Sequence, residues 1–225
     1  MILSVDASAV TASCALTNGG EVISQEFVNA GLTHSETLLP MIKRVMGAHK
    51  YSELEAIAVT AGPGSFTGIR IGVATVKGLA FNDDVPCIPV STLEAIAYNF
   101  TDENAVVCAV MDARRMQFYN ALFKVEKGVV TRLCNDRAIG IDDLRQELES
   151  CENVIVAGDG AKLCFENLGL KNVRLADEKR RFQNGVGVSK AAADKKKILP
   201  SALMPVYLRP SQAERELKLK REKEN

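Results

Sequence analysis

Residues 56–81 read AIAVTAGPGSFTGIRIGVATVKGLAF. The run over 56–61 is almost wholly apolar, as is typical of a strand that is buried on both faces. Apolar residues then recur at helical spacing over about 67–82. A glycine-rich loop joins the two elements. A buried strand, a tight loop and a helix in this order predict an α/β unit with a parallel sheet.

The loop itself is a candidate anion site, because glycine permits positive φ angles and the first N–H groups of a helix bind anions. It fits neither standard phosphate loop: a dinucleotide fingerprint needs glycine where Thr67 stands, and no Gly-Lys-Ser/Thr follows. A tight crossing that lets the helix pack closely is the competing interpretation. The loop comprises Gly62, Pro63, Gly64, Ser65, Phe66, Thr67 and Gly68.

The order of elements around this stretch predicts two α/β lobes. Each lobe is expected to run βββαβαβα, with a boundary near residues 99–104. The turn Asn18-Gly19-Gly20 predicts a hairpin, and Thr33 and Ser91 open capping boxes. In the first half we expect strands over 2–6, 11–17, 21–28, 56–61 and 87–90 and helices over about 33–48, 67–82 and from 91. In the second half we expect strands over 105–111, 117–125, 129–134, 154–157 and 173–175 and helices over 142–150, 161–168 and 186–193.

Composition narrows the class of protein. The 225 residues include 28 basic and 28 acidic side chains, which argues against a surface dedicated to nucleic acid. No apolar run reaches the roughly 18 to 20 residues of a membrane span, and no signal segment is apparent, so we expect a cytoplasmic protein. The six cysteines form no CxxC pair and are expected to be reduced. The only histidines, His34 and His49, are too far apart for a metal pair on one helical face, so no metal site is predicted.

An aspartate ends the first strand of each predicted lobe, and Gly158-Asp159-Gly160 precedes a helix. Their positions resemble the phosphate and nucleotide loops of the actin-like ATPase superfamily, where such carboxylates hold Mg²⁺ through water. That superfamily often has glycine where Ala7 and Ala113 stand, and turn formation is the competing interpretation. The sequence therefore predicts at most a vestigial nucleotide site, at Asp6, Asp112, Gly158, Asp159 and Gly160.

The helices over 33–48 and 67–82 carry more apolar surface than one sheet can cover. Ordinary packing within the lobe is one interpretation, and a protein–protein interface is the other. The predicted interface residues are His34, Leu38, Met41, Ile42, Val45, Ile69, Arg70, Val73, Val76 and Lys77.

Several of these motifs together resemble the TsaB (YeaZ) family, over residues 1 to about 209. The resemblance is specific through the glycine loop and the first helix and looser over 125–200. The segments that carry it are Asp6-Ala7-Ser8, Thr33-His34-Ser35-Glu36-x-Leu38-Leu39-Pro40, Gly62-Pro63-Gly64-Ser65-Phe66-Thr67-Gly68-Ile69-Arg70, Val90-Ser91-Thr92-Leu93-Glu94 and Pro205-Val206-Tyr207-Leu208-Arg209.

The resemblance implies two actin-like (ASKHA, ribonuclease H-like) lobes, at 1–100 and 101–209, followed by a charged tail at 210–225 that we expect to be disordered. It also implies a non-catalytic subunit of the machinery that makes threonylcarbamoyladenosine next to the anticodon of tRNA. Such a subunit docks the catalytic TsaD and acts with the ATPase TsaE, and it forms a homodimer when alone. The resemblance implies no cofactor for this chain itself, whereas the complex uses ATP. Whether a nucleotide binds at the interface with the partner is a question that the sequence leaves open.

One alternative function and one charge asymmetry remain. A stand-alone actin-like ATPase or kinase would use Asp6, Asp112 and the loop at 158–160. Residues 1–176 carry 15 basic and 21 acidic side chains, whereas residues 177–225 carry 13 and 7. This asymmetry allows the basic end of the chain to make weak, salt-dependent contacts with tRNA.

Overall fold

The fold is described by a computed structural model for residues 1–29, 31 and 33–209. The predicted tail at 210–225 lies outside these described residues. Across the described part of the chain, no helix has the length and apolar character needed to cross a bilayer.

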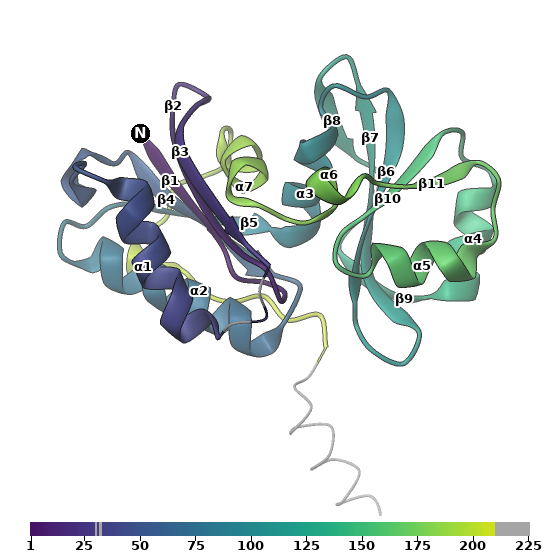
Figure 1. The fold of residues 1–225 in the computed structure, drawn as a ribbon, viewed down its shortest axis with the longest axis horizontal. Coiled ribbons are helices and arrows are strands. Elements are labelled where there is room, and N and C mark those ends of the chain that lie inside the picture. The colour runs from purple at the N-terminus through teal and green to yellow at the C-terminus, as the bar shows by residue number, and fades with distance from the viewer. Residues whose placement is uncertain (30, 32, 210–225) are drawn as a thin grey trace, which may run out of the picture.

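The first lobe is built on a five-stranded sheet with the order β3-β2-β1-β4-β5 (Figure 1). β1 pairs antiparallel with β2 and parallel with β4, as the hairpin and the buried apolar run predict. α1 and α2 pack on one face of this sheet. The bounds are β1 Ile2–Asp6, β2 Ala12–Asn18, β3 Glu21–Val28, α1 His34–Met46, η1 Tyr51–Glu53, β4 Ala56–Gly62, α2 Phe66–Phe81, β5 Cys87–Ser91, α3 Thr92–Ala97 and η2 Tyr98–Phe100.

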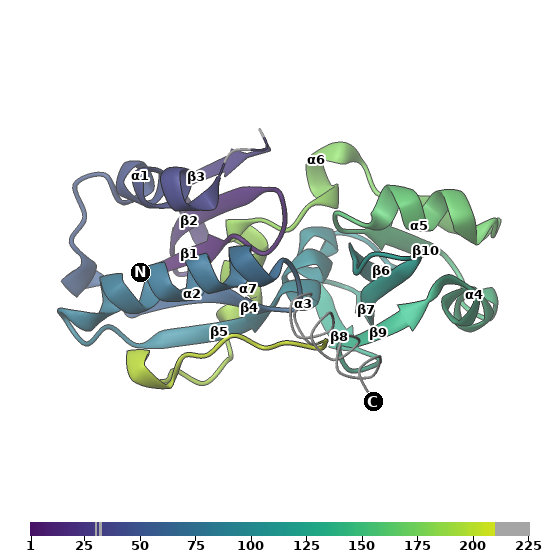
Figure 2. The same ribbon diagram turned by 90° about the horizontal axis from the view of Figure 1, so that it is seen from below.

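The second lobe has a six-stranded sheet in which β11-β10-β6-β7-β8 lie in order and β9 pairs with β7. α4 and α5 cover one face, and α3 packs against the other, so α3 lies between the two sheets (Figures 1 and 2). The bounds are β6 Ala105–Asp112, β7 Gln117–Glu126, β8 Val129–Arg132, β9 Arg137–Gly140, α4 Ile141–Glu149, β10 Val154–Ala157, α5 Ala161–Leu168, β11 Val173–Leu175, α6 Glu178–Arg181, α7 Gly185–Ala192 and η3 Pro200–Ala202.

The predicted βββαβαβα order is confirmed in the first lobe but is wrong in detail in the second. β9 adds a strand that the sequence did not predict, because its four residues are too short to show a period. Ser91 caps α3 as expected, accepting a hydrogen bond from the backbone of Glu94 at 3.3 Å. Thr33 precedes α1 but its side chain makes no cap hydrogen bond.

The helix predicted over 186–193 for the second lobe packs on the first sheet instead. Observed as α7, it covers the face opposite α1 and α2, and Ser189 Oγ lies 2.7 Å from Thr17 Oγ1 of β2. The chain then stays with the first lobe, where Ile198 bridges to Cys87 of β5. The predicted second lobe therefore does not extend to 209, because an apolar helical face does not reveal which sheet it will cover.

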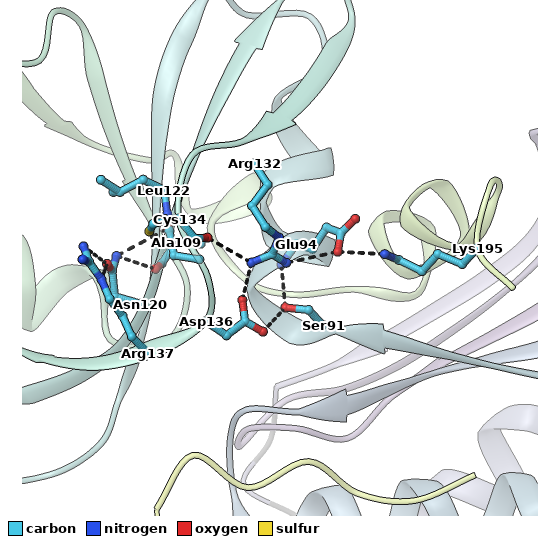
Figure 3. Close-up of polar contacts among 11 residues, drawn as sticks. Ser91, Glu94, Ala109, Asn120, Leu122, Arg132, Cys134, Asp136, Arg137 and Lys195 are labelled. Atoms are coloured by element: carbon cyan, nitrogen blue, oxygen red, sulfur yellow. Dashed lines mark hydrogen bonds and ion pairs between the residues drawn. The ribbon is translucent and has the colours of Figure 1, made fainter. Parts of the chain in front are cut away.

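An ion-pair network ties the second lobe to α3 and to the segment that follows α7 (Figure 3). The guanidinium of Arg132 donates to Glu94 of α3 at 3.1 Å and to Asp136 at 2.5 Å. Asp136 also accepts from Ser91 at 2.6 Å, and Glu94 accepts from Lys195 at 3.0 Å. Because these side chains are largely shielded from water, the network helps to fix the lobes relative to one another.

Gly185→Ala tests the placement of α7. A Cβ on Gly185 would lie 2.6 Å from the backbone nitrogen of Ala15, so α7 would be forced away from β2. We expect the free energy of unfolding to fall by about 1 to 3 kcal/mol in urea titrations. Gly78→Ala is the matched control: its Cβ meets open space on α2, and alanine should stabilise the helix by up to about 1 kcal/mol. Equal stability of Gly185→Ala and the wild type would contradict this packing.

Candidate functional site

The glycine loop packs directly against the turn that joins β1 to β2. A Cβ on Gly64 would overlap the carbonyl oxygen of Ser8, and a Cβ on Gly68 would overlap that of Ala7. The backbone N–H of Ser65 donates to the Ser8 carbonyl at 2.7 Å, and the Ser65 hydroxyl accepts from Gly68 at the start of α2. Of the two interpretations of this loop, the geometry supports the close crossing.

The other side of the same loop is covered by the segment that follows η3. The N–H of Val206 donates to the carbonyl of Ala61 at 2.7 Å, and a Cβ on Gly62 would overlap the Val206 carbonyl. Gly62 has a φ of 132°, a conformation that other residues rarely adopt. The loop is therefore held between two backbone segments. Thr67 remains exposed, while Pro63 and Phe66 line the cavity described next.

A cavity of about 610 Å³ opens between the lobes at the ends of β1, β6 and β10. The turn after β1, the glycine loop, the turn after β6 and residues 206–209 form its walls. Asp112 and Asp159 both line it, so the structure brings together two of the predicted carboxylates. We call this cavity the inter-lobe cleft.

Asp6 lies behind the wall of the cleft and is fully buried. Its Oδ1 accepts hydrogen bonds from the hydroxyls of Ser8 at 2.6 Å and Thr60 at 2.7 Å. Burial raises the pKa of Asp6, although these hydrogen bonds and the nearby His34 oppose the shift. Asp6 therefore holds the turn after β1 in place, which is the role of a turn former.

Asp159 is the carboxylate whose ionisation is most perturbed in the cleft. Burial, and then the charge of Asp112, raise its pKa to about 7. Its Oδ1 is buried without a hydrogen-bond partner among the described residues. Asp112 is less buried and accepts from the backbone of Arg114 at 2.7 Å. The floor of the cleft therefore carries negative charge that grows as the pH rises through 7.

The glycines that flank Asp159 serve packing. A Cβ on Gly158 would overlap the carbonyl of Val110, and its N–H donates to the carbonyl of Arg181 at 2.7 Å. The N–H of Gly160 donates to the carbonyl of Val110 at 3.3 Å. The N–H groups of both glycines are thus engaged by the chain itself. Within the described ranges, no group of three or more His, Cys, Asp or Glu side chains is arranged to hold a metal ion.

The predicted interface residues of α1 and α2 prove to be mostly core residues, which corrects that prediction. Seven apolar side chains are at most 5% exposed and belong to one core cluster: Leu38, Met41, Ile42, Val45, Ile69, Val73 and Val76. The additional apolar face of α2 is covered by the chain's own C-terminal segment. Leu203 is fully buried there, and the Lys77 ammonium donates to its carbonyl at 3.2 Å.

The outer faces of α1 and α2 carry a different set of residues. Leu39 is 40% exposed and Phe81 is 79% exposed, and Ala74 and Gly78 lie exposed on α2. His34 is partly buried, and its Nε2 donates to the carbonyl of Ala9 at 2.6 Å. The sequence pattern could not identify this outer face, because it did not show that a distant segment covers the rest of α2.

Asp159→Asn tests the electrostatics of the cleft. The folded pKa of about 7 lies above the usual 3.8, so the unfolded chain loses this proton first as the pH rises. The free energy of unfolding should therefore fall between about pH 4 and pH 7 and stay low above that window. We expect Asp159→Asn to resemble the wild type at pH 4 and to be more stable at pH 8, by on the order of 2 to 4 kcal/mol.

Urea titrations at several pH values measure this difference. Glu166→Gln, which removes an exposed carboxylate from α5, is the control and should leave the pH profile unchanged. A constant difference between Asp159→Asn and the wild type from pH 4 to pH 8 would contradict the raised pKa.

Known proteins resemble this chain in both sequence and fold. A family model described as "TsaD: tRNA N6-adenosine threonylcarbamoyltransferase" matches residues 28–176. The tRNA threonylcarbamoyladenosine biosynthesis protein TsaB of Bacillus subtilis is 30% identical over 157 residues, which are 69% of this chain and 69% of that protein. TsaB of Escherichia coli is 35% identical over 127 residues, which are 55% of this chain and 54% of that protein.

The solved structure described as YeaZ from Pseudomonas aeruginosa superposes with a TM-score of 0.80 at 25% identity, covering 92% of this chain and 99% of that one. This likeness confirms the predicted fold class of two actin-like lobes. Together with the extent of the match to the Bacillus subtilis protein, it establishes that the chain belongs to the TsaB (YeaZ) family.

Proposed function

We propose that this chain is a non-catalytic subunit in the formation of threonylcarbamoyladenosine in tRNA, one that docks and activates TsaD together with the ATPase TsaE. The relatives named above are tRNA threonylcarbamoyladenosine biosynthesis proteins. The observation that carries the non-catalytic part is that backbone N–H groups of the glycine loop and of the loop at 158–160 are bonded to the chain's own carbonyl oxygens. Val110 accepts the Gly160 N–H, and Ser8 accepts the Ser65 N–H.

The same observation disfavours a stand-alone actin-like ATPase or kinase. Asp6 is sealed in the wall of the cleft, so it cannot reach a solvated Mg²⁺ without rearrangement. We propose that the chain needs no cofactor of its own and acts in the cytoplasm. ATP would be used by the complex, and a nucleotide at the partner interface is compatible with this proposal.

The docking surface that we propose is the outer face of α1 and α2. Ala74 and Gly78 are small exposed residues one helical turn apart on α2, which permits close approach of a partner helix. Leu39 on α1 and Phe81 at the end of α2 add exposed apolar area. The same face would join two copies of this chain when TsaD is absent. The buried side chains of the core cluster support this face from beneath.

Reconstitution tests the function. TsaD, TsaE, tRNA and threonylcarbamoyl-adenylate would be incubated with and without this chain, and modified adenosine would be measured by mass spectrometry of nucleosides. We expect product formation to depend on this chain, because it activates the catalytic subunit. Equal product in both arms would contradict the proposed function.

Ala74→Arg tests the docking surface. The long charged side chain would separate α2 from a partner helix while leaving the core beneath it intact, so we expect co-elution with TsaD in size-exclusion chromatography to be lost. Ala138→Arg makes the same change at an exposed position on β9 of the second lobe and should co-elute normally. Retained co-elution of Ala74→Arg would place the interface elsewhere. Both variants should melt as the wild type does.

A further inference from the structure

We propose that the mouth of the inter-lobe cleft binds a single-stranded segment of RNA, with arginines holding phosphates and Tyr207 stacking on a base. This inference extends the proposed function, since it names the surface of this chain that would meet the RNA. It rests on three features of the mouth: an aromatic cluster, a set of arginines and the acidic floor beneath them.

The aromatic cluster lies where α2 meets the C-terminal segment. The rings of Phe66 and Tyr207 are stacked with centroids 4.6 Å apart and an interplanar angle of 29°. The guanidinium carbon of Arg70 lies 3.8 Å from the centroid of Phe66, and its Nε donates to the Tyr207 hydroxyl at 2.8 Å. These contacts fix the rings in place. Tyr207 is still 38% exposed, so part of its surface is open to a base.

Two arginines line the cleft, Arg114 in the turn after β6 and Arg209 in the segment after η3. Arg114 and Arg115 occupy the turn between β6 and β7 with φ angles of 68° and 58°, followed by Met116 at 56°. Left-handed backbone at three successive non-glycine residues costs conformational free energy, and such strain is concentrated at functional sites. The Arg114 side chain is 85% exposed. Arg209 donates to the carbonyl of Ala113 at 3.0 Å and joins the segment after η3 to this turn.

These arginines are poorly matched by carboxylates. Among residues 1–29, 31 and 33–209, Arg70, Arg115 and Arg209 form no ion pair, and Arg114 is paired only with Asp112 at 3.6 Å. Guanidinium groups that remain available in this way are suited to phosphate. They are also the charged side chains that stack most readily on aromatic rings and bases.

The acidic floor decides how an anion can bind. Asp112 and Asp159 lie inside the cleft, so a compact polyphosphate would be repelled from the interior. An extended strand that crosses the mouth places its phosphates on the arginines of the rim and avoids the floor. Single-stranded RNA also presents unstacked bases, which an exposed tyrosine can accept. An acidic polypeptide would use the arginines but would gain little from the aromatic cluster, so we favour RNA.

The first test measures the affinity of the purified full chain for a fluorescent, unstructured RNA oligonucleotide over a range of salt concentrations. The double variant Arg114→Gln, Arg115→Gln should weaken binding on the order of tenfold at low salt, and should reduce the slope of log K against log salt by about 0.7 for each phosphate that an arginine no longer neutralises. The matched control is the double variant Lys127→Gln, Lys171→Gln, which also removes two exposed positive charges. These lysines lie at the ends of β7 and β11 that are remote from the cleft, and Lys127 shares the positive φ of the arginine turn, at 51°. It should bind as the wild type does.

The second test isolates stacking. Tyr207→Phe keeps the ring and should retain the wild-type affinity, whereas Tyr207→Leu should bind roughly tenfold more weakly. Thermal melts check that both variants fold. Should Tyr207→Leu be unfolded, photocrosslinking of 4-thiouridine RNA to the wild-type chain replaces it, and a crosslinked peptide from residues 205–209 is the expected result.

Three outcomes would overturn the inference: the arginine variant and its lysine control bind RNA equally well, crosslinks map only to other faces, or polyglutamate competes as well as RNA does and is unaffected by Tyr207→Leu. The last outcome would assign the surface to an acidic polypeptide.

Failure of this inference is distinguishable from failure of the proposed function. If modification requires the chain while the variants bind RNA normally, only this inference falls; if RNA binds at the mouth but modification does not need the chain, only the proposed function falls.

Discussion

The carbonyl oxygens of Ala7 and Ser8 lie where side chains on Gly68 and Gly64 would have to be. This contact between two backbone segments sets the start of α2, and Ser65 secures it with a hydrogen bond to Ser8 at 2.7 Å. The other side of the glycine loop contacts Val206, and this contact anchors the last described segment of the chain to the first lobe. One wall of the inter-lobe cleft and the cover over α2 both depend on this arrangement.

The same contact accounts for the glycines of this loop by close packing, although the loop resembles a phosphate-binding element. Glycine is required in a phosphate-binding loop and in this packed loop alike, because in both an oxygen atom lies close to the backbone at a helix N-terminus. Here the oxygens belong to the chain's own carbonyl groups. At the second lobe, Gly158 and Gly160 meet the backbone of β6 in a comparable way. An actin-like framework is thereby combined with glycines that pack closely against the chain's own backbone.

Local patterns in the sequence were sufficient for the first lobe. Continuous apolar runs, the turn at residues 18–20 and the cap at Ser91 are short-range signals, and each corresponds to an observed element. The placement of α7 was not predictable, because the apolar face that covers the first sheet would fit the second equally well. The excess apolar surface of α2 was identified correctly but was assigned to a partner. It is covered by Leu203, which lies more than 120 residues away along the chain, and no periodicity encodes such a contact.

The central claim is that the N–H groups of Ser65, Gly158 and Gly160 are bonded to the chain's own carbonyl oxygens and are not free to hold the phosphates of a nucleotide. Calorimetric titration of the isolated chain with Mg-ATP tests it most directly. The account predicts no heat of binding at millimolar nucleotide and, through linkage, no rise in the melting temperature. Saturable binding that is abolished by Asp112→Asn would contradict it, since the cleft would then hold a nucleotide although these N–H groups are engaged by the chain itself.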